Sequence, residues 1–218
     1  MIDANFEDRM TDIGNNQYSY TFSVSRPGKI TISVLKYIGG RVFQEYYPTA
    51  DITLNSDFFT YSSDLNLNWG TGVIYNGKLD NVGSKSYFKI LAPTTGSYIF
   101  TVDVDDTFKL WINSDLIIDK GCCGLLSSTT IPLTEGTFYE GYIEYNEFGG
   151  DAYMILYWEI NGGGRVLVPS SAFYGPEYVS SPVTITIECT NGESKVISGG
   201  RPVCQAVCGD GLRHSTEQ

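Results

Sequence analysis

Short runs of alternating apolar and polar residues, separated by turn signals, fill most of this 218-residue chain. No segment keeps a helical period of apolar residues for three turns. Leu65, Leu67 and Trp69 alternate with polar residues, and the turn "PTTG" separates the strand-like runs "SYFKILA" and "SYIFTVDV". Many short strands joined by tight turns are typical of an antiparallel sandwich or barrel. The sequence therefore predicts an all-β fold.

Aromatic residues and glycine are abundant, with 16 Tyr, 11 Phe and 24 Gly, a composition that suits strands and turns. Aromatic side chains are dense in "TFYEGYIEY" and "AYMILYWEI". We interpret them as core residues or as neighbours that pack on one sheet face, rather than as a platform for ligand stacking. We expect Trp69 and Trp111 to belong to the core in the same way.

The charge balance is acidic, with 25 Asp plus Glu against 14 Lys plus Arg and a net charge of −11. Such a surface disfavours nucleic acid and anionic membranes, whereas it can hold hard cations such as Ca²⁺. No apolar run approaches the ~20 residues that cross a bilayer, so we expect no direct membrane insertion. The single histidine, His214, lies near the end of the sequence, which removes His-based triads and His-rich zinc sites.

Five cysteines and the tail "CTNGESKVISGGRPVCQAVCGDG" indicate an oxidising compartment and a disulfide module that is cut short. A zinc site at "CQAVC" is the alternative, although no second cysteine pair at zinc spacing accompanies it. The first ten residues have no basic region followed by an apolar one, so we expect a fragment of a longer chain. We predict an extracellular or cell-surface protein, and the disulfide candidates are Cys122, Cys123, Cys189, Cys204 and Cys208. Because adjacent cysteines rarely pair with each other, we expect Cys122 and Cys123 to bond to other partners, such as Cys189, that fix the loop after them.

Several stretches resemble, in type, order and spacing, the motifs of the PA14 family. "LKYIGGRVFQEYY" and "LNLNWGTG" are similar to its opening segments, and "YFKILAPTTGSYIFTVDVDDTFKLWINSDLIID" to its long signature around an acidic pair. "LTEGTFYEGYIEYNEFGGDAYMILYW" and "VLVPSSAFYGPEY" resemble its closing segments. The resemblance runs from about Lys36 to Tyr178. It implies an antiparallel β-sandwich or barrel of PA14 type, with calcium-binding loops at one end.

Three features near the motifs refine this resemblance. Thr107 stands where the family usually has a glycine after the acidic pair. The adjacent cysteines of "DKGCCG" are similar to those of the flocculin and GLEYA branch, which contains sugar-binding cell-surface adhesins. The tail "CGDGLRHSTEQ" resembles the start of a cysteine-rich repeat of large secreted proteins.

These segments predict three parts of the chain. Residues 1–30 form an upstream strand pair, which belongs either to the core or to a neighbouring module. Residues 31–178 form the PA14-like carbohydrate-binding domain. Residues 179–218 form a C-terminal hairpin and a truncated cysteine-rich tail.

The resemblance implies a calcium site at Asp105 and Asp106, which in sugar-binding members are joined by a cis peptide bond and hold one ion together. Ca²⁺ takes six to eight oxygen ligands, so two carboxylates leave room for loop oxygens and for sugar hydroxyls in place of water. Asp103, on the same strand, we interpret as solvated. The implied metal ligands are Asp105, Asp106, Asn146, Asp151 and the backbone of Phe148 and Gly150, and the implied sugar contacts are Asp105, Asp106, Glu147, Phe148 and Gly149.

We predict a non-enzymatic, lectin-like module of a secreted or cell-surface adhesin, which binds vicinal glycan hydroxyls through Ca²⁺. We expect a monomeric domain within a larger modular protein. The alternatives are a structural or protein-interaction PA14 module without sugar binding, and an accessory module of a glycan-active enzyme. A glycosidase is disfavoured because its two carboxyl groups stand about 5–10 Å apart across the sugar bond, and are not consecutive residues that share an ion.

Overall fold

The computed structural model describes residues 35–178 without a gap, with side chains up to residue 177. Outside them it describes the backbone of six strands, β1 (Thr11–Gly14), β2 (Gln17–Ser19), β3 (Gly28–Ile32), β18 (Val183–Ile187), β19 (Glu193–Ser198) and β20 (Arg201–Ala206). The chain divides into one unit of residues 34–180 and another made of residues 1–33 and 181–218. In the latter, β1 pairs with β2, β3 with β18 and β19 with β20. The boundaries drawn from the sequence, after residues 30 and 178, stay a prediction.

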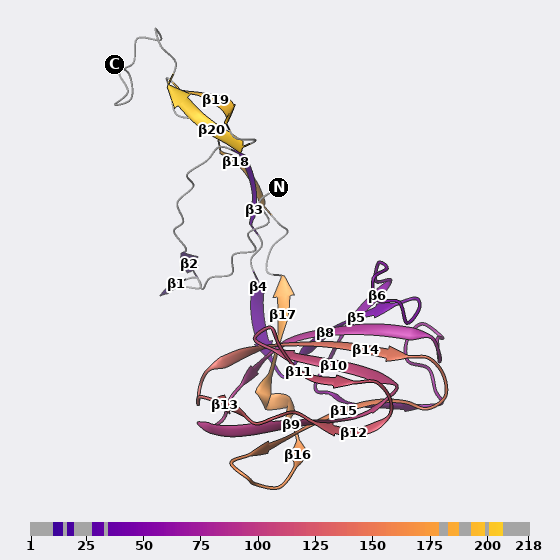
Figure 1. The fold of residues 1–218 in the computed structure, drawn as a ribbon. Helices are drawn as coiled ribbons and strands as arrows, with labels where there is room; N and C mark the ends of the chain where they lie inside the picture. The colour runs from indigo at the N-terminus through magenta and orange to yellow at the C-terminus, as the bar shows by residue number, and fades with distance from the viewer. Residues whose placement is uncertain are drawn as a thin grey trace. The chain divides into compact units, whose positions relative to one another are not determined.

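The larger unit contains two antiparallel sheets (Figure 1). The eight-stranded sheet has the order β11-β10-β14-β8-β17-β4, and β5 pairs with β8 and with β6. Its strands are β4 (Leu35–Gly39), β5 (Val42–Tyr47), β6 (Phe58–Ser62), β8 (Val82–Leu91), β10 (Thr107–Ile112), β11 (Asp115–Lys120), β14 (Phe138–Glu147) and β17 (Phe173–Tyr178).

The second sheet has six strands in the order β12-β9-β15-β16, with β13 paired to β9 and β7 paired to β15. These are β7 (Asn66–Gly70), β9 (Gly96–Asp105), β12 (Gly124–Ser127), β13 (Ile131–Leu133), β15 (Ala152–Ile160) and β16 (Val166–Leu167). The helical structure of the described residues is one 3₁₀ turn, η1 (Ser170–Ala172). None of the helical segments that the structure describes is both long and apolar enough to cross a bilayer.

The core lies between the two sheets and takes alternate residues from each. In β10, Phe108, Leu110 and Ile112 are buried, and in β9 every second residue from Tyr98 to Val104 is buried. This period of two is that of a strand with one face against a core. The predicted all-β class and the antiparallel sandwich are confirmed.

The alternation also decides where the two tryptophans lie. Trp69 packs against the core, as expected, together with Leu67 from the same strand. Trp111 does not, because its neighbours Leu110 and Ile112 occupy the inward positions of β10. The expectation that Trp111 is a core residue is therefore wrong, and its ring packs on Tyr142 at the outer face of the eight-stranded sheet.

Candidate metal and ligand site

Two chain crossings between the sheets lie next to each other at one end of the sandwich. The chain leaves β9 at Asp105 and enters β10 at Thr107, and it leaves β14 at Glu147 and enters β15 at Ala152. Asp105 is paired with Tyr153 in one sheet, and Thr107 with Asn146 in the other. The strand registers therefore bring the acidic pair beside the loop of residues 148–151, and both directly follow the ends of long strands.

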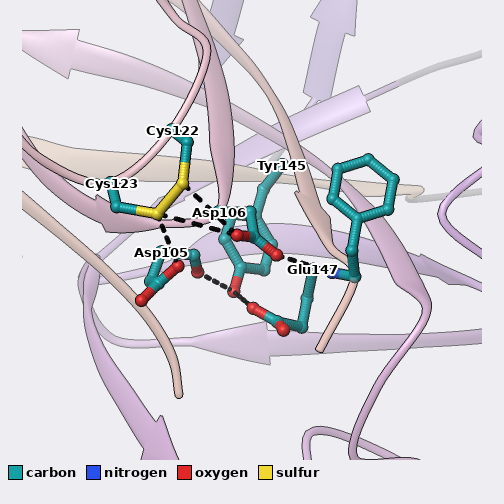
Figure 2. The surroundings of a disulfide bond; sticks show 7 residues. Asp105, Asp106, Cys122, Cys123, Tyr145 and Glu147 are labelled. Atoms are coloured by element: carbon teal, nitrogen blue, oxygen red, sulfur yellow. Dashed lines mark hydrogen bonds between the residues drawn. A yellow bond between two sulfur atoms is a disulfide. The ribbon is translucent and has the colours of Figure 1, made fainter. Parts of the chain in front are cut away.

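Asp105 and Asp106 are joined by a cis peptide bond, as the resemblance implied. The backbone N–H of Phe148 donates a hydrogen bond to Oδ2 of Asp106 over 2.8 Å. The hydroxyl of Tyr145 donates to the backbone carbonyl of Asp105 over 2.6 Å. Figure 2 shows the side chain of Tyr145 directed toward the pair. A hydrogen bond from β14 thus holds Asp105, and a hydrogen bond from the loop after β14 holds Asp106.

The electrostatic environment of the pair is acidic. Burial, then a hydrogen bond and the charge of Asp106, and then the charge of Asp151 raise the pKa of Asp105. Within residues 35–177, the ion pairs formed by lysine and arginine lie elsewhere on the domain, at Arg41–Glu177, Lys89–Glu140 and Lys109–Asp119. The described residues therefore leave the negative charge of the pair uncompensated.

Glu147 adds a third carboxyl group below the pair. Its side chain is 0% exposed, and Oε1 has no hydrogen-bond partner among the described residues. Burial, followed by the charge of Asp106, raises the pKa of Glu147 to about 7, although hydrogen bonds from Tyr145 and the Gly149 backbone act to lower it. The Tyr145 hydroxyl has one proton for two acceptors, the Asp105 carbonyl and Oε2 of Glu147 at 3.2 Å. A buried carboxyl with a free oxygen so close to Asp106 is a polar group that needs a partner.

Cys122 and Cys123 form a disulfide with each other, which corrects the expectation that each would bond to a more distant cysteine such as Cys189. β12 pairs with β9 from Gly124 onward, so the short connection after β11 lies over the end of β9. Sγ of Cys123 is 2.8 Å from Oδ1 of Asp105, and Sγ of Cys122 is 3.5 Å from Oδ1 of Asp106 (Figure 2). Because disulfide sulfurs carry no proton, these are contacts rather than hydrogen bonds. Cys189 and Cys208, and the side chain of Cys204, lie outside the described residues.

Ligand atoms of Asp105, Asp106, Cys122 and Cys123 all lie within 4.8 Å of one another, so the group could hold a metal ion. The two sulfurs are bonded to each other and are therefore not thiolates, the form in which cysteine binds metals. The donors that remain are carboxylate oxygens. Hard cations prefer such a set.

The loop residues predicted from the sequence are only partly brought to the pair. The backbone of Phe148 contacts Asp106, whereas the Asn146 side chain faces the other way and donates a hydrogen bond to the Ala50 carbonyl. Asp151 is exposed and near enough for its charge to raise the pKa of Asp105. Glu147, expected to contact a sugar, is buried instead.

The glycines at 149 and 150 are exposed, and the positive φ of 106° at Gly150 is one that residues with a side chain rarely adopt. The backbone N–H of Gly150 donates to Oδ1 of Asp80 over 3.2 Å. Asp80 precedes β8, and nothing in its sequence context marked it as a neighbour of the site. Tyr145 was also missed, although a signal existed: the alternation of "YIEYNE" places Ile143, Tyr145 and Glu147 on one face.

Comparison with known proteins decides the family. Residues 40–172 match the PA14 domain. The chain belongs to the PA14 family. No curated protein matches the chain. The solved structures similar to this chain come from proteins with different names.

An anti-sigma factor domain-containing protein from Clostridium clariflavum is 28% identical, with a TM-score of 0.59 over 72% of this chain and 52% of that one. This chain thus spans about half the length of that similar protein. The PA14 domain of the antifreeze protein MpAFP is 15% identical, with a TM-score of 0.53 over 67% of this chain and 94% of that one. The A domain of epithelial adhesin 6 from Candida glabrata, solved with Galβ1-3GlcNAc, is 14% identical, with a TM-score of 0.50 over 72% of this chain and 100% of that one.

Proposed function

We propose that the PA14 domain of this chain is a non-catalytic, calcium-dependent carbohydrate-binding module. The observation that carries the proposal is the Asp105–Asp106 pair, held at the crossing between the sheets beside a glycine-rich acidic loop, with no cationic side chain of the described residues paired to it. Two adjacent carboxylates that repel each other in this setting favour a divalent cation, which removes the repulsion.

The residues present fit Ca²⁺ better than a softer metal. The free donors are oxygens, and the buried Oε1 of Glu147 without a hydrogen-bond partner shows that the polar groups beneath the pair are not fully satisfied by the protein. Asp105 and Asp106 would hold the ion with their carboxylates, assisted by Asp151 and the backbone carbonyls of Phe148 and Gly150. Asn146 remains in this proposed set through the resemblance, and would first have to release Ala50.

When bound, Ca²⁺ offers coordination positions to two neighbouring sugar hydroxyls. Phe148 would contact the sugar, and two observations support this role: its side chain is 58% exposed, and its backbone N–H donates to Asp106. Gly149 lies next to it and leaves the approach open. So few contacts give weak binding, with millimolar dissociation constants and a binding free energy of about −4 kcal/mol.

The Candida glabrata adhesin domain, solved with a disaccharide, supports a glycan as the ligand class. We extend the proposal to an extracellular or cell-surface location and to a monomeric domain in a larger adhesin. The chain spans about half the length of the similar anti-sigma factor domain-containing protein. Any activity of a longer protein that contains this domain is therefore proposed here as well.

A structural or protein-interaction module is the second candidate, and two observations favour it. The Asn146 amide is engaged with Ala50, and the sulfurs of Cys122 and Cys123 lie against the carboxylates that would bind the ion. In that case the domain would keep the fold, with or without a bound ion, and would not recruit a sugar. An accessory role beside a separate glycan-active catalytic domain would use the same site as the first candidate.

A glycan array with and without EDTA separates these candidates. We expect a set of signals for the calcium-loaded domain that disappears both in excess EDTA and in the Asp105→Ala and Asp106→Ala variants, while circular dichroism shows that both variants stay folded. If the array gives signals but none of them is lost in EDTA and in both variants, the calcium-dependent function is excluded. A calcium-dependent rise in melting temperature without any array signal would assign the domain to the structural class.

A further inference from the structure

The outer face of the eight-stranded sheet carries a continuous row of aromatic rings, one from each of five neighbouring strands. The strand registers place Phe43 opposite both Tyr61 and Tyr87, and Tyr142 opposite both Tyr87 and Trp111. We call these residues the aromatic row: Tyr61 (β6), Phe43 (β5), Tyr87 (β8), Tyr142 (β14) and Trp111 (β10). Segments far apart in the sequence thus contribute to one straight line of rings across the strands.

The rings of the aromatic row contact one another along its whole length. The ring centroids are 5.4 Å apart for Tyr61 and Phe43, and 6.1 Å apart for Phe43 and Tyr87. They are 5.2 Å apart for Tyr87 and Tyr142, and 5.1 Å apart for Tyr142 and Trp111. All four distances lie within the range of direct aromatic contact. Four strand spacings of about 4.8 Å give the row a length of roughly 19 Å.

The aromatic row points away from the core. The strand neighbours of its members, such as Val42, Phe88 and Ile143, are buried between the sheets. Four of the rings are half-buried, and Tyr61 at one end of the row is 39% exposed. The row is therefore not explained by packing of the sandwich.

Hydrogen bonds fix the orientation of two neighbouring rings of the row, Tyr87 and Tyr142. The Tyr87 hydroxyl donates to Oε2 of Glu45 over 3.2 Å, and the Tyr142 hydroxyl donates to Oε1 of Glu144 over 2.7 Å. Glu144 is two residues along the same strand, so the ring of Tyr142 leans along β14 rather than standing upright. Rings that are already held in place lose little conformational entropy when a ligand stacks on them.

Charged residues flank the aromatic row on both sides. On one side the cross-strand register runs through Glu45, Lys85, Glu144, Lys109 and Asp119, so the sign of the charge alternates from strand to strand. Lys109 and Asp119 form an ion pair of 3.3 Å, and on the other side Lys89 and Glu140 form one of 3.3 Å. Alternating, paired charges create no field of one sign, so the surface favours an uncharged ligand over a nucleic acid or an acidic polymer.

We propose that the aromatic row is a second glycan-binding surface, which binds a neutral polysaccharide chain lying across the strands and needs no calcium. The apolar C–H faces of pyranose rings would stack on the aromatic rings, and the sugar hydroxyls would reach the charged side chains on both sides. The length of the row accommodates several consecutive sugars. A protein partner fits less well, because the centres of protein interfaces are depleted of charged residues, and here charges border a strip only one residue wide.

This surface shares no residue with the proposed calcium site. On β14, Tyr142 lies four residues before Asn146, a distance of about 14 Å along a strand. Each site can therefore be removed without the other, and the failure of one proposal leaves the other open.

Native affinity electrophoresis in excess EDTA tests the proposal. The gels contain a neutral β-glucan, xylan or mannan, and polygalacturonate serves as the acidic comparison. We expect at least one neutral polymer to retard the protein and polygalacturonate not to. The Trp111→Ala and Tyr142→Ala variants should lose affinity by about tenfold, which is the effect of about 1.4 kcal/mol of stacking energy. Trp111→Phe, which keeps a ring, should retain most of the retardation, and a loss there despite a folded domain would contradict stacking.

The Leu167→Ala variant is the matched control, because Leu167 is an exposed apolar residue of the other sheet. Its retardation, measured against a gel without polymer, should equal that of the wild type. Absence of retardation by all three neutral polymers would overturn the proposal, as would retardation that survives Trp111→Ala. Concentration-dependent dimerisation that Trp111→Ala abolishes, without retardation by any polymer, would assign the row to a second copy of the chain and would also overturn it.

Discussion

Tyr145 donates a hydrogen bond to the backbone carbonyl of Asp105 over 2.6 Å, and this bond joins the inner face of one sheet to the last residue of β9 in the other. Tyr145 is 0% exposed and its ring stacks on Trp69 with centroids 5.8 Å apart. The position of the acidic pair is therefore set from within the core, by a residue that neither a metal ion nor a sugar would touch.

Replacement of Tyr145 by phenylalanine keeps the ring and removes this hydrogen bond. A buried acceptor that loses its donor costs about 1–3 kcal/mol, and we expect the free energy of unfolding to fall by that amount. Calcium affinity should fall as well, because the end of β9 is less well held. Urea denaturation measures the free energy of unfolding, and calorimetry measures the calcium affinity.

Tyr157→Phe is the control. The Tyr157 hydroxyl has no hydrogen bond to a described residue, so we expect its free energy of unfolding to change by less than ~0.5 kcal/mol. Equal effects of the two variants would contradict the role given to Tyr145.

The raised pKa of Glu147 predicts that the stability of the metal-free protein depends on pH. Its pKa is about 7 in the folded state against an ordinary 4.5, so between these values the folded state holds a proton that the unfolded state has lost. This contribution to stability is full below about pH 4.5 and is lost as the pH rises through about 7. In EDTA, the melting temperature should therefore decline over this interval by less in Glu147→Gln than in the wild type. Glu135→Gln, at an exposed position, should keep the wild-type slope, and an unchanged slope in Glu147→Gln would contradict the burial of this carboxyl.

Gly141 tests the packing of the central strand. A Cβ atom built at Gly141 would collide with the ring of Phe88, which belongs to the core. Overpacking of this kind typically costs 1–3 kcal/mol, so Gly141→Ala should lower the free energy of unfolding by about that much. Gly164→Ala, in an exposed loop with open space around it, is expected to change it by less than ~0.5 kcal/mol. If both variants were equally stable, the register of β14 against β8 would be in doubt.

Mass spectrometry of tryptic peptides can detect the disulfide between Cys122 and Cys123. Tryptic digestion after alkylation without a reductant should yield the peptide of residues 121–165 with Cys122 and Cys123 both unmodified and two hydrogens lighter than the dithiol form. After reduction, both cysteines should be alkylated. A cross-link from this peptide to one that contains Cys189, Cys204 or Cys208 would contradict the pairing in the structure and restore the expectation drawn from the sequence.

Sequence patterns were sufficient to predict the fold class and to single out the acidic pair. The alternation in β9 and β10, and the turn signals between short runs, follow from strand geometry that is local along the chain. The resemblance to the PA14 family supplied the pairing of Asp105 with Asp106 and its cis bond, which local propensity alone would not have indicated.

Positions that depend on contacts between distant segments were not predicted. Asp80 meets Gly150 only because the loop before β8 lies near the end of β14, and Asn146 turns to Ala50 for a similar reason. Cys122 and Cys123 were expected to bond elsewhere, since their closeness to Asp105 depends on the pairing of β12 with β9. The aromatic row also required the register of five strands, although each of its residues was visible in the sequence.

Isothermal titration of the EDTA-stripped domain with Ca²⁺ tests the central claim most directly, in parallel with Asp105→Asn and Asp106→Asn, which preserve side-chain shape and remove one charge each. We expect one saturable calcium site in the wild type and its loss, or a weakening of at least about a hundredfold, in both variants, equivalent to about 2.8 kcal/mol. Calcium binding of wild-type strength in either variant, or no calcium binding by the wild type, would contradict it.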